Sequence, residues 1–329
     1  MANLTIIEAI NLAMNSEMAR DPSVVVLGED IGKNGGVFRA TLGLQEKYGT
    51  ERVVDTPLAE TLVAAMSIGM ATQGLRPVAE IQFSGFLYPC VDQVVNHATR
   101  MRNRTRGRIS CPMVIRAPNW GGIHAPEHHS EPLETTFACM PGLRVVCPSN
   151  PARAYGLLLA AIRDPDPVIF LEPTRCYRLF KSPVEDNGEA LPLDTAFVER
   201  EGSDITLISW GAMMHETRLA AEALAEQNIS AEVVDVATLK PLDNETILTS
   251  VAKTGRCVII QEAPRAGGWG SEIAAMIAEH GLLSLFAPIM RVAGYDTIMP
   301  LAKQERVYIP DVERILKEVR KVFEIAPKS

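Results

Sequence analysis

A regular alternation of short apolar runs with helix-forming segments is the feature that most restricts how this chain can fold. In the first half, runs typical of buried strands occur at residues 24–27, 53–54, 76–81, 113–115, 145–146 and 168–171. Helical patterns separate them at residues 61–74, 86–99 and 152–162, after a first helix that opens with the capping-box sequence Thr5-Ile6-Ile7-Glu8. This alternation predicts an α/β fold, in which helices cover both faces of a parallel sheet.

The same alternation returns after residues 181–193, where proline, glycine and polar residues indicate a linker. Strand-like runs follow at 205–209, 231–236 and 257–260, and helical segments at 215–227, from about Leu242, at 271–279 and at 312–323. A chain of 329 residues is long enough for about two domains. We therefore predict two doubly wound parallel-sheet domains, residues 1–185 and residues 194–329.

One strand-to-helix corner combines a carboxylate with a helix of small residues. Residues 55–60 read Asp-Thr-Pro-Leu-Ala-Glu, and Pro57 forces a turn after the strand. Glu60 should therefore lie where helix polarity and backbone N–H groups gather. The carboxylate either interacts with the helix N-terminus, as acidic residues commonly do, or serves a partner, because an unpaired buried charge is costly.

Several polar side chains follow the carboxyl ends of the predicted strands. Glu29 follows the first strand, Glu60 the second, and Gln82 with Phe86 the third, while a Gly/His/Pro loop at residues 119–130 follows the fourth. Because open α/β sheets bind ligands beyond these strand ends, the convergence predicts a functional site at one edge of the sheet.

The histidine loop allows three interpretations. Pro126 prevents a helix from joining His124 to His128, and no cysteine pair is near, so the pattern speaks against zinc. The histidines are either ordinary surface residues of a loop or proton donors facing a substrate, since imidazole titrates near neutral pH.

Composition and missing motifs exclude other functions. The formal net charge of −8 argues against nucleic-acid or membrane partners, so the basic run at residues 100–108 is better explained as a solvated helix end or an edge facing an acidic subunit. Six scattered cysteines without a C-x-x-C pair, and no signal peptide, predict a cytoplasmic protein. The chain has no P-loop, no G-x-G-x-x-G and no G-x-S-x-G sequence.

Taken together, these motifs resemble one family. They are Gly28-Glu29-Asp30, Asp55-Thr56-Pro57-Leu58-Ala59-Glu60, Gln82-Phe83-Ser84-Gly85-Phe86, Asp92-Gln93-Val94, His124-Ala125-Pro126-Glu127-His128-His129-Ser130 and Lys240-Pro241-Leu242-Asp243. In this order, over nearly the whole chain, they resemble the beta subunit of the thiamine-diphosphate-dependent 2-oxo acid dehydrogenase component, in the transketolase-like superfamily. The resemblance implies a pyrimidine-binding domain followed by a C-terminal domain for assembly and docking.

The resemblance also implies roles for single residues. Glu60 would hydrogen-bond a ring nitrogen of the cofactor's aminopyrimidine, so that the opposite nitrogen acts as an internal base. Leu58, Gln82 and Phe86 would line the pyrimidine pocket, with Glu29 close by. His129 would orient the lipoyl group or donate a proton during acyl transfer, although His128 is adjacent. The family can also hold a potassium ion, here near Met113, Ala161, Ile162, Asp164 and Asp166.

A missing motif predicts the partners. The chain contains no G-D-G sequence, which in thiamine enzymes holds magnesium and the diphosphate, so the family resemblance implies that a separate alpha subunit supplies that half. The chain would then work in an alpha-beta heterotetramer, with a second beta subunit, a dihydrolipoyl acyltransferase core and a 2-oxo acid substrate. Pyruvate is the first choice, and branched-chain 2-oxo acid and acetoin dehydrogenases are alternatives. A non-catalytic assembly module of the same fold is the alternative from another class.

Overall fold

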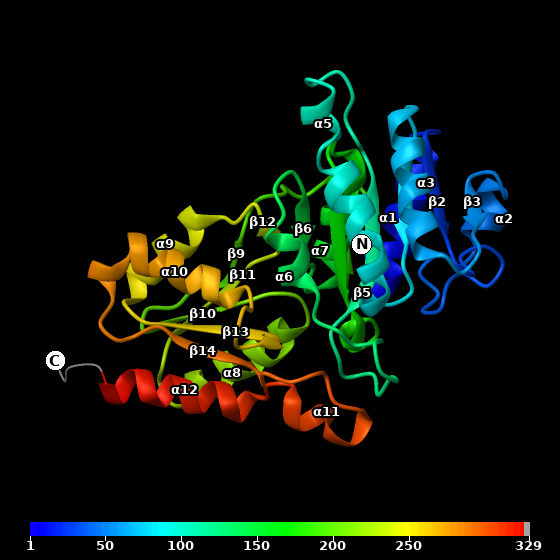
Figure 1. The fold of residues 1–329 in the computed structure, drawn as a ribbon. Helices are drawn as coiled ribbons and strands as arrows, with labels where there is room; N and C mark the ends of the chain where they lie inside the picture. Colours follow the sequence, from blue (N-terminus) through cyan, green and yellow to red (C-terminus); the bar gives the residue numbers. More distant parts are fainter. Residues whose placement is uncertain (326–329) are drawn as a thin grey trace.

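The computed structural model describes residues 1–325 and is built around two large sheets (Figure 1). The first sheet has seven strands in the order β12-β6-β7-β5-β4-β2-β3, parallel except for the pair β12 and β6. Its strands are β2 Val24–Gly28, β3 Val53–Asp55, β4 Arg76–Glu80, β5 Val114–Asn119, β6 Arg144–Val146, β7 Val168–Pro173 and β12 Thr238–Lys240. Strands β2, β5 and β7 are buried along their whole length, as in sheets that are covered on both faces.

Two groups of helices cover this sheet. Helices α1 (Ile6–Arg20) and α7 (Pro151–Arg163) pack against each other, while α3 (Glu60–Thr72) packs against β4. Helix α1 begins with the predicted capping box, because the Thr5 side chain accepts from the Glu8 N–H and the Glu8 carboxylate accepts from the Thr5 N–H at 2.8 Å. The sequence therefore specifies the start of α1 locally.

The second sheet has the order β14-β13-β10-β11-β9, with only β9 antiparallel to its neighbour. Its strands are β9 Phe197–Arg200, β10 Ile205–Ser209, β11 Ala231–Asp235, β13 Cys257–Pro264 and β14 Met290–Gly294. Helices α8 (Met214–Glu226) and α12 (Val312–Ile325) cover one face, and α9 (Asn244–Thr254) and α10 (Gly270–His280) cover the other (Figure 1). Both large sheets thus confirm the predicted α/β class.

Shorter elements complete the fold. Strands β1 (Ala2–Leu4) and β8 (Ser182–Val184) form a separate antiparallel pair. The short helices are α2 Leu44–Tyr48, α4 Val91–Gln93, α5 Met101–Arg104, α6 Glu134–Ala138 and α11 Ala302–Tyr308. Among residues 1–325, every helix is too short or too polar to cross a membrane.

The structure differs from the sequence-based expectation in three places. The segment predicted as one helix over 86–99 is a 3-10 helix (Ser84–Cys90), a short α4 and a π-helical turn (Val94–Ala98), because Pro89 lacks the N–H that a regular helix needs. Strands β1, β8, β9 and β14 and helices α2, α5, α6 and α11 were not predicted. Strand β12 follows the predicted linker yet joins the first sheet, so the two sheets do not divide the chain strictly in sequence order. The division into residues 1–185 and 194–329 stays a prediction.

Candidate active site

The predicted site residues meet at one edge of the first sheet. Strands β3, β2, β4 and β5 are adjacent and parallel, so their carboxyl ends lie side by side. Glu29 directly follows β2, Glu60 opens α3 after the turn from β3, and Gln82 follows β4 by two residues. The loop that carries the histidines leaves β5 at the same edge. Topology therefore gathers groups that are distant in sequence.

Two neighbouring carboxylates define the inner part of this edge. Glu29 is 8% exposed, and its Oε1 is buried without a hydrogen-bond partner within residues 1–325. Burial, and then the nearby charges of Glu60 and Asp30, raise the pKa of Glu29. The Glu60 carboxylate is half-buried and forms no hydrogen bond or ion pair with any described residue, although the Cys90 thiol donates to its backbone carbonyl at 3.3 Å. Both groups are thus available to a ligand that carries hydrogen-bonding nitrogen atoms.

Apolar and aromatic side chains border the carboxylates. Leu58 is 81% exposed, beside the corner that Pro57 makes. The ring of Phe86 lies 5.0 Å from the ring of His129, and the Phe83 ring lies 4.4 Å from it. The structure therefore brings the predicted pocket residue Phe86 and the predicted catalytic residue His129 into direct contact. Gln82 is half-buried, and its side chain has no hydrogen-bond partner among the described residues.

Hydrogen bonding distinguishes the two adjacent histidines. His129 Nδ1 lies 2.8 Å from the backbone oxygen of Glu127, and since a carbonyl oxygen only accepts, Nδ1 carries the proton of this bond. The Nε2 atom of His129 is then left to act on a ligand. His128 is exposed and adopts a left-handed backbone, with φ of 68°. Its place outside the aromatic cluster favours His129 as the functional residue.

Carboxylates from the second half of the chain hold the start of the histidine loop. The Gly121 N–H donates to Glu262 of β13 at 2.5 Å, and the Gly122 N–H donates to Glu305 of α11 at 2.7 Å. Glu305 also accepts from the His124 N–H at 3.1 Å. Glycine suits both positions, because a Cβ at Gly121 would make a tight contact of 3.0 Å with Glu305 Oε1 and Gly122 has a left-handed φ of 96°. Sequence reasoning missed both glutamates, since nothing near them in sequence points to the loop.

A buried ion network joins strands β4, β5 and β7 near the same edge of the sheet. Arg116 of β5 donates to both oxygens of Glu172 at 2.7 and 3.0 Å and to Glu80 Oε2 at 2.9 Å, and Tyr177 also donates to Glu172. Arg116 is 1%, Glu80 4% and Glu172 0% exposed. Burial is the main cause that raises the pKa of Glu80, while Arg116 opposes it. Glu80 ends β4, two residues before Gln82, so the network fixes the strand end that carries Gln82.

The residues predicted to hold potassium lie together at the opposite ends of the strands. They are Met113, Ala161, Ile162, Asp164 and Asp166. Arg76 donates to the backbone oxygens of Ile162 and Asp164 at 2.8 and 3.1 Å, and the Met113 oxygen accepts from the backbone N–H of residue 168 at 2.9 Å. An oxygen-rich set suits a hard cation, but this guanidinium already uses two of the oxygens. The potassium site stays a prediction.

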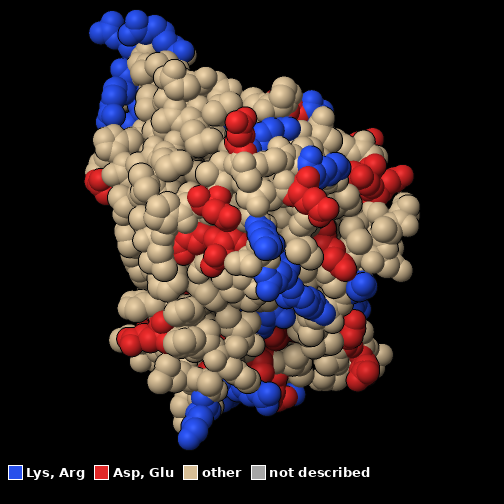
Figure 2. Space-filling view, turned by 90° about the vertical axis from the view of Figure 1, so that its right-hand side faces the viewer, with Lys and Arg blue, Asp and Glu red and all other residues tan. Residues whose placement is uncertain are grey.

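The histidine loop as a zinc site and the basic run at residues 100–108 are the two remaining features that the sequence suggested. Within residues 1–325 no three His, Cys, Asp or Glu side chains are placed to hold a metal ion together, so nothing favours zinc at the histidine loop. The arginines of the basic run 100–108 are exposed, and Arg102 pairs with Asp166 at 2.8 Å. Figure 2 shows basic side chains on the topmost projection of the molecule, where Figure 1 places α5.

Comparison with known proteins settles the family. Residues 2–179 match the transketolase pyrimidine-binding domain, and residues 194–315 match the transketolase C-terminal domain. The chain is 47% identical to pyruvate dehydrogenase E1 component subunit beta of Acholeplasma laidlawii. The alignment spans 327 residues and covers 99% of this chain and 100% of that protein. This chain belongs to the family of 2-oxo acid dehydrogenase E1 beta subunits. Membership confirms the resemblance that its motifs indicated.

Two further relatives describe the range of the E1 beta family. The pyruvate dehydrogenase E1 component subunit beta of Bacillus subtilis is 47% identical over 324 residues, covering 98% of this chain and all of that protein. The 2-oxoisovalerate dehydrogenase subunit beta of the same organism is also 47% identical, over 326 residues, with the same coverage. A solved structure described as a split-gene transketolase, an inactive beta4 tetramer, has a TM-score of 0.80 and 22% identity over 99% of this chain and 100% of its own. That likeness supports the fold.

Gly85 offers a test of how tightly this E1 beta chain holds its histidine loop. A Cβ at Gly85 would lie 1.8 Å from the backbone oxygen of His128, so Gly85→Ala must displace the loop. We expect activity to fall about 100-fold, because a shift near 1 Å can cost that much when catalytic groups are misplaced. Gly69→Ala is the control, since a Cβ there meets nothing within 4 Å. Steady-state kinetics of both variants, each assembled with an alpha subunit, measure the activity, and thermal unfolding checks the folding. Unchanged activity in Gly85→Ala would show that the loop is not held here.

Proposed function

We propose that this chain is the beta subunit of a pyruvate dehydrogenase E1 component. It would take part in the oxidative decarboxylation of a 2-oxo acid on thiamine diphosphate and in acyl transfer to lipoyl groups of an acyltransferase. The names of full-length relatives support this proposal. The observation that carries it is the Glu60 carboxylate, which opens α3 beside the buried Glu29 and has no partner of its own among the described residues.

The side chains at the sheet edge fit the aminopyrimidine ring of thiamine diphosphate. The buried, unpaired Oε1 of Glu29 and the free carboxylate of Glu60 supply hydrogen-bond acceptors. Leu58 and Phe86 supply apolar surface, and Gln82 has an unused amide. Leu58 is 81% exposed in the isolated chain, as expected for a residue that completes its contacts with a ligand and a second subunit.

Each side chain has a distinct task in the proposed mechanism. When bound, thiamine diphosphate supplies a nucleophilic carbon and an electron sink for the loss of carbon dioxide. Glu60 would share a proton between its carboxyl group and a ring nitrogen of the bound cofactor, and the buried Glu29 beside it would supply a second hydrogen-bonding oxygen. His129 presents Nε2, because its Nδ1 is bound to the Glu127 carbonyl, and so can deliver a proton or orient the lipoyl group.

The proposed partners follow from what this chain lacks. Its sequence contains no G-D-G motif, so we place magnesium and the diphosphate on an alpha subunit, within an alpha-beta heterotetramer that also contains a second beta subunit. We further propose that the complete E1 component docks on a dihydrolipoyl acyltransferase core in the cytoplasm. A potassium ion near Asp164 and Asp166 remains part of the proposal on the family resemblance alone, because Arg76 and the backbone N–H of Asp166 already use oxygens of Asp164.

A branched-chain 2-oxo acid is the second candidate substrate. The 2-oxoisovalerate dehydrogenase subunit beta of Bacillus subtilis matches this chain as closely, at 47% identity, as the pyruvate relatives do. Discrimination between substrates of this size needs only about 1–3 kcal/mol of pocket contacts. Pyruvate stays the first choice because four relatives that are 47% identical, from three genera, carry the pyruvate dehydrogenase name.

Reconstitution with an alpha subunit tests the proposal. The chain should be co-expressed with a candidate alpha subunit and assayed with pyruvate, 3-methyl-2-oxobutanoate and acetoin, with and without thiamine diphosphate and magnesium. We expect decarboxylation that needs both subunits and the cofactor and that prefers pyruvate. A preference for 3-methyl-2-oxobutanoate would select the branched-chain candidate. No cofactor-dependent turnover by an intact complex would favour a non-catalytic assembly module.

His129→Ala separates the two halves of the reaction. We expect acyl transfer to lipoamide to slow about 100-fold while decarboxylation changes much less, because a positioned general acid typically contributes that much to its own step. Decarboxylation would be followed with an artificial electron acceptor and acyl transfer with free lipoamide. His128→Ala is the matched control, since His128 is exposed outside the aromatic cluster. Equal slowing of both steps by His129→Ala would refute this division of labour.

A further inference from the structure

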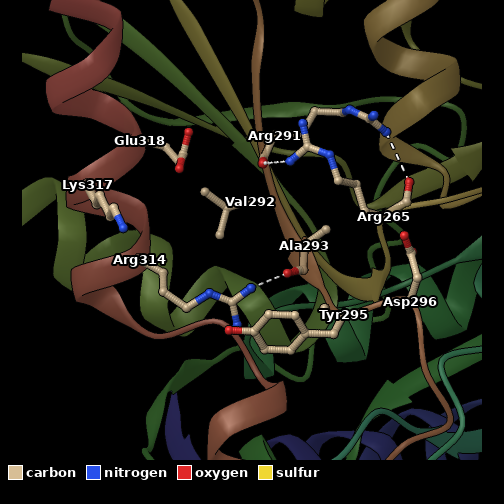
Figure 3. Close-up of a pocket in the computed structure, with 10 residues that line it drawn as sticks. Arg265, Arg291, Val292, Ala293, Tyr295, Asp296, Arg314, Lys317 and Glu318 are labelled. Atoms are coloured by element: carbon tan, nitrogen blue, oxygen red, sulfur yellow. Dashed lines mark hydrogen bonds between the residues drawn. The ribbon is translucent and has the colours of Figure 1, made fainter.

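A cavity of about 310 Å³ opens beside strand β14 and helix α12 (Figure 3). Strand β14 belongs to the second sheet, whereas Glu60 follows a strand of the first. Four basic side chains surround it: Arg265 after β13, Arg291 of β14, and Arg314 and Lys317 of α12. Two acidic side chains, Asp296 and Glu318, also border it. The lining therefore has an excess of two positive charges, in a chain whose formal net charge is −8.

None of the four basic groups has a carboxylate within ion-pair distance among residues 1–325. The two acidic residues of the lining are engaged elsewhere, because Asp296 accepts from the Ala266 N–H at 2.7 Å and Glu318 pairs with Lys321. Farther along α12, Arg320 does pair with Glu313 at 2.8 Å. The missing partners are thus a property of this cavity and not of the helix as a whole.

Backbone contacts fix the arginines in place. Arg265 donates to the backbone oxygen of Arg291 at 2.9 Å, and Arg291 donates to the backbone oxygen of Arg265 at 3.2 Å. Arg314 donates to the oxygens of Tyr308 and Ala293 and lies 4.7 Å from the Tyr295 ring. Each guanidinium has five N–H donors, so each keeps donors free after these bonds. The arginines are held in advance, which lowers the entropy cost of binding a ligand.

Holding these cations together without an anion is unfavourable. Partial burial, and then the charge of Arg265, lower the pKa of Arg291, while the charge of Asp296 opposes that shift. An anion inside the cavity would relieve that repulsion and use the free N–H donors. A phosphoryl group carries about two negative charges at neutral pH, which matches the excess charge of the lining, whereas a monocarboxylate carries one.

We propose that the cavity between β14 and α12 binds a small phosphorylated metabolite, with its phosphoryl group among Arg265, Arg291, Arg314 and Lys317. Arginine forks suit the geometry of phosphate oxygens, and Lys317 adds a mobile point charge at the mouth. The volume is at the lower limit of cavities that hold small molecules, which favours a compact metabolite over a nucleotide. This site is separate from the proposed thiamine diphosphate site and does not depend on it.

Calorimetric titration of the full-length chain with inorganic phosphate, at constant ionic strength, tests the proposal. We expect one saturable site per chain, competition by glycerol 3-phosphate, and no competition by succinate. Lys317→Glu should weaken phosphate binding at least tenfold without loss of folding, because Lys317 is exposed and has no partner among the described residues. Lys303→Glu on α11 is the matched control, with the same charge change outside the cavity, and should bind as the wild type does.

Four results would overturn the proposal. They are binding of phosphate that does not saturate, equal binding by wild type and Lys317→Glu, equally tight binding of succinate, and failure of glycerol 3-phosphate to compete. Each is a binding measurement and is independent of whether the chain decarboxylates pyruvate.

Discussion

Replacing Glu60 by glutamine should reduce thiamine-diphosphate-dependent decarboxylation of pyruvate by the reconstituted enzyme by two to four orders of magnitude. A positioned proton-transfer group typically contributes that much to a reaction rate. Glutamine keeps the size of the side chain and its place at the start of α3, but its amide cannot share a proton with a ring nitrogen. The loss should therefore appear mainly in kcat, with the fold and the assembly intact.

The control for Glu60→Gln is Glu51→Gln, because Glu51 is an exposed carboxylate in the turn before β3. Both variants should be purified with the alpha subunit and compared for thermal midpoint, subunit ratio and turnover with saturating cofactor. Glu51→Gln should retain wild-type turnover. If Glu60→Gln also retains more than about a tenth of it, the assignment of Glu60 as the proton-holding group is wrong.

The parts of the site that depend on local order were predictable from the sequence. The capping box of Thr5 and Glu8 and the corner at Pro57 each depend on residues that are close together in the sequence, and the structure contains both. The convergence of Glu29, Glu60 and Gln82 required one further step, the rule that parallel strands place their carboxyl ends together. The family motifs then suggested a task for each residue.

The supports of the site were not predictable, because they join residues far apart in the chain. Glu262 binds Gly121 across 141 residues, and Glu305 binds Gly122 across 183. A glutamate at a strand end or in a short helix carries no local sign of such a contact. Strand β12 escaped prediction for a related reason, since three residues that pair with β6 across the linker show no periodic pattern.

The irregular helical segment after β4 illustrates a competition between local pattern and tertiary contact. Its apolar residues predict a regular helix over 86–99, yet the chain first forms a 3-10 helix that contains Pro89. Gly85 lies in that helix and lets the His128 backbone approach closer than any side chain would permit. This close approach brings the ring of Phe86 against the ring of His129. The contact depends on the irregular helix and is not implied by the apolar pattern over 86–99.

Arg116→Met should have the largest effect on stability. The substitution leaves the buried carboxylates of Glu80 and Glu172 without their shared cation, and removal of one partner from a buried ion network typically costs about 3–5 kcal/mol. Denaturant unfolding of the full-length chain measures the loss. Arg320→Met is the matched control, because its pair with Glu313 is 50% and 67% exposed and such a pair contributes about 0–1 kcal/mol.

The loss in Arg116→Met should also depend on pH in a definite direction. Burial already raises the pKa of Glu80, and Arg116 opposes that rise, so the variant should raise this pKa further. A carboxyl group whose folded-state pKa is raised contributes stability below its unfolded pKa of about 4.5 and loses that contribution as the pH rises through the folded value. The deficit of Arg116→Met should therefore be smaller at pH 5 than at pH 8. A deficit that is constant over this range would mean that lost packing, and not the unpaired carboxylates, accounts for the destabilisation, since loss of the long arginine side chain alone has no such pH dependence.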